Sequence, residues 1–366
     1  MRLGMNVARR GKEILERLTT RKVIREPVFP YVTLRQRYVK VRLDFTKGCN
    51  LRCRMCPSVA FGDFEKREMP PSLFDKIAGE VFPRTEHLTI GCGAEPLFAK
   101  NFDQYLQTVR RYRIPYTLII SNGSLLTDQK ITAMLDAGIN ELSVSLEAAS
   151  KEKYESIRVG SKFDRLLENL NRFNELKAER HTDKPLLSFN TVLMKDTLPE
   201  LAPLIRLAKQ MGVTTLSMAH LIPFAGLDNE RESLYYHQEL ADEKMQEARE
   251  LAESLGIRVF CPSLFRGEED DPRPSEKGVS GMACLQPWIF MVINCDGDAY
   301  PCGWLFGEKP AGSFRKHSFR QIWFGSMYTK LREEIRTGNL RAQCGRCPAA
   351  GLGDPTRKES FEQVQF

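Results

Sequence analysis

Short runs of β-branched and large apolar residues alternate along the chain with longer segments whose apolar residues recur every three or four positions. The short runs predict six strands, at residues 41–46, 87–91, 116–121, 141–146, 186–193 and 214–221. The longer segments predict amphipathic helices at residues 71–81, 102–112, 127–137, 163–179 and 198–211. Strands that alternate with helices in this way indicate a parallel α/β sheet with right-handed crossovers.

The pattern changes in the last third of the chain. A helix at 238–254 and a short strand at 257–261 precede residues 266–280, which are rich in charge, Pro, Gly and Ser and predict a domain boundary. Beyond it, Asp296-Gly297 favours a hairpin turn between strands at 290–294 and 299–301, and a helix is expected at 318–336. We therefore expect three parts: a basic N-terminal arm with a helix (1–40), an α/β domain (41–265) and a small α+β domain (266–366).

Composition is that of a folded globular protein. The 366 residues are 42% hydrophobic and 28% charged, which excludes a largely disordered chain. No apolar run approaches the roughly 20 residues of a membrane span, and charges interrupt the first 20 residues. The sequence thus predicts a cytoplasmic protein without a membrane span or a secretory signal.

The net charge of +7 belongs to the N-terminal arm, because residues 1–40 hold eleven Lys or Arg against three Glu. Such an arm could attract nucleic acid, an anionic membrane or an acidic substrate, but a solvated helix docked on a larger body is the favoured interpretation. Nucleic acid is not expected as a partner, since the arm offers few aromatic residues for base stacking (Phe29, Tyr31 and Tyr38).

Ten cysteines without a secretion signal point to metal binding or catalysis rather than disulfides. Cys49, Cys53 and Cys56 follow the first predicted strand with the spacing C-x3-C-x2-C. Three thiolates on one short loop suit a [4Fe–4S] cluster whose fourth iron has no protein ligand. A structural zinc site is the alternative, but it requires four ligands and no fourth Cys or His lies nearby.

With these cysteines in place, the segment TKGCNLRCRMCP at 46–57 resembles the cluster loop of the radical S-adenosylmethionine (SAM) enzymes. The resemblance implies a partial (β/α)6 TIM barrel in which the loop follows the first strand. It also implies that the open iron binds the amino and carboxylate groups of SAM. Reductive cleavage of SAM then gives a 5′-deoxyadenosyl radical that abstracts hydrogen from a substrate, with electrons from an external one-electron reductant such as flavodoxin or ferredoxin.

Further motifs stand where this family places its SAM contacts. Residues 91–96, GCGAEP, look like the family's GGEP-type motif, in which Gly93 allows close backbone approach and Glu95 can pair with the SAM ammonium. Met55 stands where the family often has an aromatic residue under adenine. By the same resemblance, the remaining candidate SAM contacts are Asn122 and Ser145 for the ribose and carboxylate, Arg158 for the carboxylate, and Leu221 and Pro223 for adenine.

Four late cysteines resemble the SPASM auxiliary-cluster domain in its shorter twitch form. They are Cys284, Cys302, Cys344 and Cys347. The resemblance implies one auxiliary [4Fe–4S] cluster with no vacant iron, and a second one is not expected because the 19 residues after Cys347 contain no Cys. A zinc ribbon built from the same thiolates is the alternative. Cys295 could compete with Cys302, although the Gly297-x4-Cys302 spacing favours Cys302; Cys92 has no assigned role.

A fully ligated cluster is suited to accepting an electron. Hydrogen abstraction followed by proton loss would leave one electron on the substrate, so the expected reaction is a two-electron oxidation, with His220 or Glu147 as the candidate general base. Alternatively, a thiol at Cys261 could return a hydrogen atom to the substrate, which would make the protein an epimerase.

The substrate is the property that the sequence determines least. The 48 residues before Cys49 do not read as a compact peptide-recognition domain, so we expect a small polar metabolite such as a sugar or aminocyclitol. A peptide-modifying maturase is the second hypothesis. A non-catalytic iron–sulfur or zinc-binding module is the third, and the organised motifs at Glu95, Asn122 and Ser145 argue against it.

Overall fold

A computed structural model describes residues 37–347 of the chain, with gaps at 61–64, 92, 224–226, 228–229, 267–283 and 346. The chain divides into two compact units, Met1–Tyr38 and Val39–Phe366. The predicted basic arm, its helix, Cys92 and the predicted boundary segment after Arg266 lie outside the described residues. The helices and strands of the described residues all belong to the second unit.

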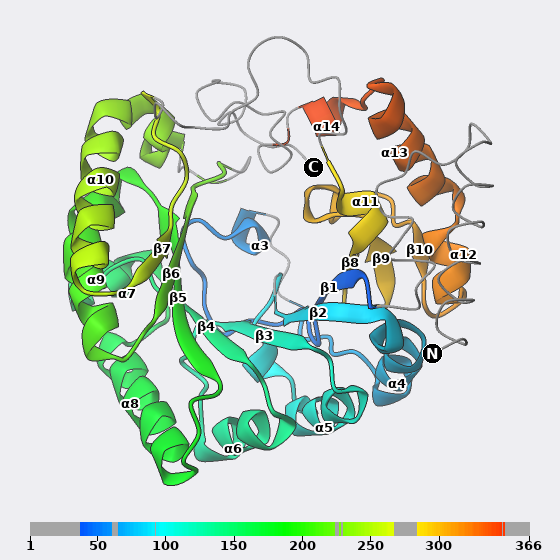
Figure 1. Cartoon of the computed structure of the whole chain (residues 1–366), viewed down its shortest axis with the longest axis horizontal. Helices are drawn as coiled ribbons and strands as arrows, with labels where there is room; N and C mark the ends of the chain where they lie inside the picture. The colour runs from blue at the N-terminus through cyan, green and yellow to red at the C-terminus, as the bar shows by residue number, and fades with distance from the viewer. Residues whose placement is uncertain are drawn as a thin grey trace, which may run out of the picture. The chain divides into compact units, whose positions relative to one another are not determined.

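One curved sheet of ten strands organises this unit, in the order β10-β9-β8-β1-β2-β3-β4-β5-β6-β7 (Figure 1). Strands β1 to β7 lie parallel to their neighbours, β8 is parallel to β1, and β9 and β10 are antiparallel. Their bounds are β1 Val39–Leu43, β2 Thr85–Ile90, β3 Tyr116–Ser121, β4 Glu141–Ser145, β5 Leu186–Leu193, β6 Thr215–His220, β7 Arg258–Phe260, β8 Phe290–Ile293, β9 Asp298–Tyr300 and β10 Gly312–Ser313. The predicted α/β fold with a partial barrel and a small C-terminal extension is confirmed.

Most helices cover the outer side of this arc of strands, whereas the short α3, Pro57–Ala60, lies within the arc (Figure 1). Those of the barrel are α3 Pro57–Ala60, α4 Pro71–Val81, α5 Phe102–Tyr112, α6 Asp128–Ala137, α7 Lys151–Ile157, α8 Phe163–Glu179, α9 Leu201–Gln210 and α10 Gln238–Ser254. Those of the C-terminal part are α11 Gln286–Ile289, α12 Phe319–Trp323, α13 Ser326–Thr337 and α14 Ala342–Gly345. Among the described residues, no helix is both long and apolar enough to cross a membrane.

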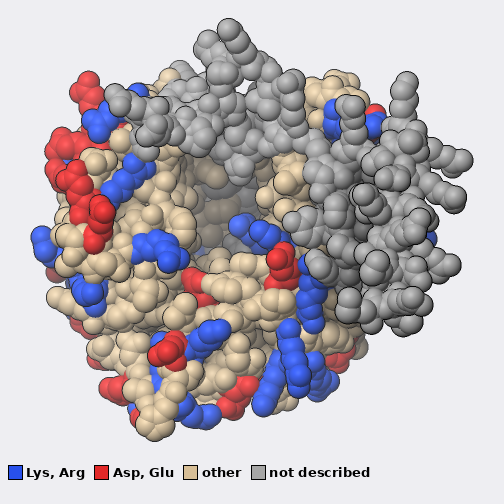
Figure 2. Space-filling view, viewed as in Figure 1, with Lys and Arg blue, Asp and Glu red and all other residues tan. Residues whose placement is uncertain are grey.

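The two faces of the sheet differ in kind. On β1 the burial alternates residue by residue: Val39, Val41 and Leu43 are buried, whereas Lys40 and Arg42 are exposed. Since side chains alternate across a strand, the buried set faces the helices and the exposed set faces the inside of the arc. The inside forms the hollow seen in Figure 2. Lys40 and Arg42 therefore belong to an inner face that ligands can reach.

The predicted elements match the structure closely in the barrel and less well beyond it. The helix expected at 318–336 is two helices, because α12 ends before its C-cap Phe324 and Gly325 is the N-cap of α13. The first strand was expected at 41–46 but runs Val39–Leu43, since Asp44 turns its carboxylate onto the backbone of Gly93. The short helix α7 was not predicted.

The C-terminal part joins the barrel through its backbone. Strand β8 pairs with β1 from Lys40 to Leu43, so strands on both sides of the predicted boundary at 266 share one sheet. The three-part domain division stays a prediction, while the sheet shows that the last part is attached to the barrel along a full strand.

The tight turn at the end of β2 gives a first test. Gly91 has φ +83°, and an added Cβ would lie 2.6 Å from the Ile120 carbonyl oxygen and 2.7 Å from Pro96. Gly212 has φ +69°, but a Cβ added there would have no atom within 4 Å. A substitution at Gly212 therefore measures backbone strain without a steric clash. We expect Gly212→Ala to lower the free energy of unfolding by about 1–2 kcal/mol and Gly91→Ala to lower it by several kcal/mol in denaturant titrations. Equal losses would show that the close contacts at Gly91 relax.

Candidate active site

The loop that carries the cysteine trio follows β1 and is anchored by backbone hydrogen bonds to the segment after α7. The amide of Arg52 donates to the Val159 carbonyl at 2.8 Å, and the amide of Arg54 donates to the Ile157 carbonyl at 2.9 Å. Cys49, Cys53 and Cys56 all belong to one apolar cluster around this loop. The residues of that cluster are Leu51, Cys53, Met55, Ile157, Met194 and Leu221, with Cys49, Cys56 and Val192 packed against it.

The trio is desolvated. Burial raises the pKa of the Cys53 thiol to about 12 and also raises the pKa of Cys49. The Leu51 amide donates to the Cys49 sulfur at 3.4 Å, and the Asn122 side-chain amide lies 3.9 Å from the same sulfur. Burial favours the neutral thiols, whereas the N–H groups directed at sulfur suit the thiolates that form when the cysteines bind iron.

Glu95 is buried at the end of the predicted GGEP-type motif and holds the end of β3. Its carboxylate accepts hydrogen bonds from the Ser121 hydroxyl at 2.7 Å, the Asn122 amide at 2.7 Å and the Leu97 amide at 3.1 Å. Burial raises the pKa of Glu95, while these donors oppose the rise. The three donors come from the protein itself, so the contacts show Glu95 organising the backbone around the motif.

Other candidates for SAM contacts surround the trio. Asn122 donates to the Asn50 side chain at 3.0 Å, and Ser145 ends β4 on the inner face of the sheet. Gly93 is held by its amide, which lies 3.2 Å from both oxygens of Asp44. Met55 and Leu221 lie in the apolar cluster of the trio, and Pro223 is buried two residues after Leu221. Asp44 was not predicted from the sequence, because the first strand was expected to run through it, at 41–46.

Arg158 and Glu147 form a buried bidentate ion pair. The guanidinium Nε and Nη2 each donate to one oxygen of Glu147 at 2.6 Å, and Nη1 lies 3.7 Å from the Cys53 sulfur. Burial by itself would lower the pKa of Arg158, but Glu147 raises it above its ordinary value. A permanent positive charge is therefore fixed beside a cysteine of the trio.

The four late cysteines come together as a second set. Burial raises the pKa of Cys302 to about 12, with smaller contributions from Cys347 and Cys344. Burial also raises the pKa of Cys344 to about 11, with a smaller contribution from Cys284. Cys295, by contrast, lies near Asp296, Asp44 and Arg67. The electrostatic neighbours thus group Cys302, and not Cys295, with Cys344 and Cys347, and its assignment as a cluster ligand stays a prediction.

Both sets suit iron–sulfur clusters in the chemistry of their donors. Backbone amides of Trp304 and Leu305 are directed at the Cys302 sulfur, and that of Gln286 at the Cys284 sulfur. The indole N–H of Trp288 is buried and has no hydrogen-bond partner in the described part of the chain. In residues 37–347 outside the gaps, no three His, Cys, Asp or Glu converge closely enough to hold a single metal ion.

Comparison with known proteins agrees with this geometry. The family model of the radical SAM superfamily matches residues 43–208, and that of the SPASM iron–sulfur cluster-binding domain matches residues 284–348. The chain thus contains a radical SAM domain followed by a SPASM domain. Its cofactors are accordingly SAM, a [4Fe–4S] cluster and, through the SPASM domain, auxiliary iron–sulfur ligation.

Relatives and solved structures extend this assignment. The AdoMet-dependent heme synthase of Methanosarcina barkeri is 25% identical over 328 residues, covering 83% of this chain and 86% of the relative. The fold resembles Streptococcus suis SuiB, with a TM-score of 0.67 and 16% identity over 95% of this chain and 82% of that one. It also resembles anSMEcpe with bound AdoMet, with a TM-score of 0.60 and 15% identity over 89% of each chain. At these identities the structural likeness concerns the fold.

The predicted general bases of this radical SAM protein lie away from the inner face. His220 shares one face of β6 with the buried Leu216 and Met218, packs against Phe265, and therefore points into the helix layer. Burial lowers the pKa of His220 to about 4. Glu147 is completely buried, with both oxygens held by Arg158. In this geometry neither residue presents a proton acceptor to the barrel interior, so a role of either one as the general base stays a prediction.

Cys261 is the last of the candidate catalytic residues. It follows β7 at the edge of the sheet and is half-buried.

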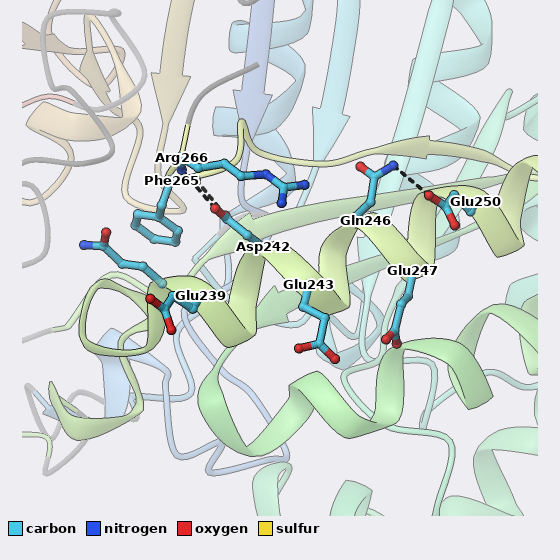
Figure 3. A pocket seen from close by; sticks show the side chains of 9 residues that line it. Glu239, Asp242, Glu243, Gln246, Glu247, Glu250, Phe265 and Arg266 are labelled. Carbon is cyan, nitrogen blue, oxygen red and sulfur yellow. Dashed lines mark hydrogen bonds between the residues drawn. The ribbon is translucent and has the colours of Figure 1, made fainter. Parts of the chain in front are cut away.

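A hollow of about 480 Å³ lies on the outer side of α10, where Glu239, Glu243 and Glu247 give it an acidic lining (Figure 3). It contains none of the predicted catalytic, SAM or cluster residues, so it is not the site of the radical SAM chemistry.

The buried ion pair beside the trio predicts a large effect on stability. Glu147→Ala leaves the Arg158 charge buried and unpaired, which should lower the free energy of unfolding by about 3–5 kcal/mol. Asp164→Ala is the matched control, because its ion pair with Lys151 is exposed to solvent and should contribute little to stability. Denaturant titration of both variants would measure the difference; similar losses would contradict the role given to the buried pair.

His220 predicts a pH dependence. Since folding lowers its pKa from 6.5 to about 4, the unfolded chain binds more protons in that window, and stability present above pH 6.5 is lost as pH falls toward 4. The loss due to His220 should reach roughly 3 kcal/mol and should be absent in His220→Gln. Unfolding free energies across this pH range measure it, with the exposed His181→Asn variant as the control. Parallel curves for wild type and His220→Gln would contradict the assignment.

Proposed function

We propose that this protein is a radical SAM oxidoreductase that removes a hydrogen atom, and then a proton and a second electron, from a small polar substrate. The trio Cys49, Cys53 and Cys56 would hold the cluster that, with SAM, supplies the 5′-deoxyadenosyl radical. The set Cys284, Cys302, Cys344 and Cys347 would hold one auxiliary [4Fe–4S] cluster that supplies an electron acceptor. An external one-electron reductant such as flavodoxin or ferredoxin would serve the first cluster.

One packing contact carries this proposal. Phe306, four residues after Cys302, lies about 3.5 Å from the point that a Cβ on Gly93 would occupy. Gly93 belongs to the GGEP-type motif, and Phe306 belongs to the loop of the late cysteines. The late set is therefore attached directly to the segment that we assign to SAM, which supports electron transfer between substrate and the auxiliary cluster.

The chain's own residues would position SAM. We propose that Gly93 allows the backbone of 93–95 to approach the methionine part of SAM and that Glu95 fixes this backbone by holding the end of β3. Asn122, Ser145 and Arg158 would bind the ribose and carboxylate. Leu221, Pro223 and Met55 would supply an apolar surface for adenine.

A small molecule is favoured over a peptide as the substrate. The relative from Methanosarcina barkeri is named a heme synthase, and haem is a small molecule. A peptide substrate remains the alternative, since SuiB, whose fold is similar, has been solved with a precursor peptide. A hydrogen-donating thiol at Cys261, which would give an epimerase, is a further alternative. Deuterium transfer from a labelled substrate into 5′-deoxyadenosine would decide among candidate substrates.

The two cysteine sets can be tested separately. We expect anaerobic reconstitution to give about eight irons per chain, and changing Cys49, Cys53 and Cys56 together to Ala should abolish 5′-deoxyadenosine formation. Changing Cys344 and Cys347 to Ala should lower the iron content to about four while SAM cleavage persists. Iron analysis and chromatography of 5′-deoxyadenosine provide the measurements.

The control is Cys295→Ala, because this buried thiol lies outside both sets and its loss should leave the iron content unchanged. Zinc in place of half of the iron would contradict the auxiliary cluster. SAM cleavage by the trio variant would contradict the assignment of the trio. A protein that binds iron but never forms 5′-deoxyadenosine would be the non-catalytic module.

A further inference from the structure

Strand β1 presents a cation to the inner face of the barrel. Arg42 is exposed although β1 lies inside the sheet, between β2 and β8. Its neighbours Val41 and Leu43 are buried against the helix layer, so Arg42 faces the opposite side, the inside of the arc. Figure 2 shows the hollow that the arc encloses. The Arg42 side chain is thus available from inside the arc and not from the outer surface.

The Arg42 guanidinium lies near the ring of Phe290 and near the backbone of Gly303. It lies 5.4 Å from the centre of the Phe290 ring, on β8. Its Nη1 is 3.5 Å from the point that a Cβ on Gly303 would occupy. Gly303 follows Cys302 of the late set, while Asp44, two residues after Arg42, holds Gly93 of the SAM motif. Arg42 therefore lies on the strand that links the two proposed cofactor sites.

Among the described residues, Arg42 has no carboxylate partner. The inner-face carboxylates do have partners: Glu141 accepts from the hydroxyls of Tyr116 and Ser188, and Asp44 accepts from the Gly93 amide. A second cation, Lys40, is exposed on the same face of β1. The inner face near β1 consequently carries positive charge that its own acids do not pair.

His87, on the neighbouring strand β2, lies close to both cations of β1. It pairs with Lys40 across β1 and β2 and packs against Tyr116. Burial lowers its pKa first, and Lys40 and Arg42 lower it further, whereas Glu141 and Glu86 oppose them. Lys40 and Arg42 therefore both contribute positive potential at His87.

We propose that Arg42 binds an oxyanion, a carboxylate or phosphate group, of the substrate. The proposal rests on the proposed function, which places the substrate in this hollow. A planar guanidinium with no carboxylate partner among the described residues matches carboxylate and phosphate oxygens in two parallel hydrogen bonds. Stacking on Phe290 fixes the plane of the fork, so the anion would be held in one orientation relative to Cys302 and Gly93.

Binding of simple oxyanions tests this assignment. The reconstituted holoenzyme, saturated with SAM so that the open iron is covered and kept without reductant, is titrated with inorganic pyrophosphate and with citrate by calorimetry. We expect at least one of them to bind with a Kd of about 1 mM or tighter, and Arg42→Gln to weaken that binding at least about tenfold. The pyrophosphate and citrate arms distinguish a phosphate-bearing substrate from a carboxylate-bearing one.

Two further variants make the result specific. Arg42→Lys keeps the charge but loses the fork, so it should bind the same anion with intermediate affinity. Arg111→Gln removes an exposed arginine from α5 on the outer side and should leave the Kd unchanged. Unchanged binding in Arg42→Gln, or no binding of either anion to wild type, would overturn the proposal. Because no SAM is cleaved in these titrations, their outcome is independent of the 5′-deoxyadenosine assay that tests the function.

Discussion

The structure depends on the pairing of β1 with a parallel strand on each side. β2 lies on one side and β8 on the other, and both align with residues 40–43 of β1. The cysteine trio follows β1, Asp44 at its end holds Gly93, and Arg42 faces the backbone beside Cys302. Because one strand is fixed by two ladders, the SAM motif and the late cysteines take up a defined relation although nearly two hundred residues separate Gly93 from the nearest of them.

Charged groups near the cysteine trio differ in burial from those on the inner face of β1. Near the trio, charged groups are buried and fully engaged: Glu147 pairs with Arg158, and Glu95 accepts three hydrogen bonds from the end of β3 and the turn after its own motif. These contacts order the groups around the thiolates at the cost of desolvation. On the inner face below them, Arg42 remains exposed. The buried and hydrogen-bonded charges thus order the cofactor site, whereas the exposed guanidinium of Arg42 can still bind a ligand.

Sequence reasoning succeeded where a pattern is local. The helices at 71–81, 102–112 and 163–179 have the predicted bounds, because apolar periodicity and flanking residues determine where a helix begins and ends. The spacing of the trio was equally local. It did not reveal the burial of Glu147 and His220, which carry the right chemical groups for a base but occupy positions whose exposure only the packing reveals. Asp44 and Arg42 were overlooked for the same reason.

By itself, the sequence determined the barrel elements, the two cysteine sets and the family, since these depend on periodicity and short-range spacing. The tertiary structure decided which residues meet across long separations: Cys302 rather than Cys295 beside Cys344 and Cys347, and β8 beside β1. It also decided which way each polar side chain points, because alternation along a strand assigns residues to two faces, and only the position of the helices shows which face is closed. That distinction separates His220, turned into the helix layer, from Arg42, turned toward the hollow.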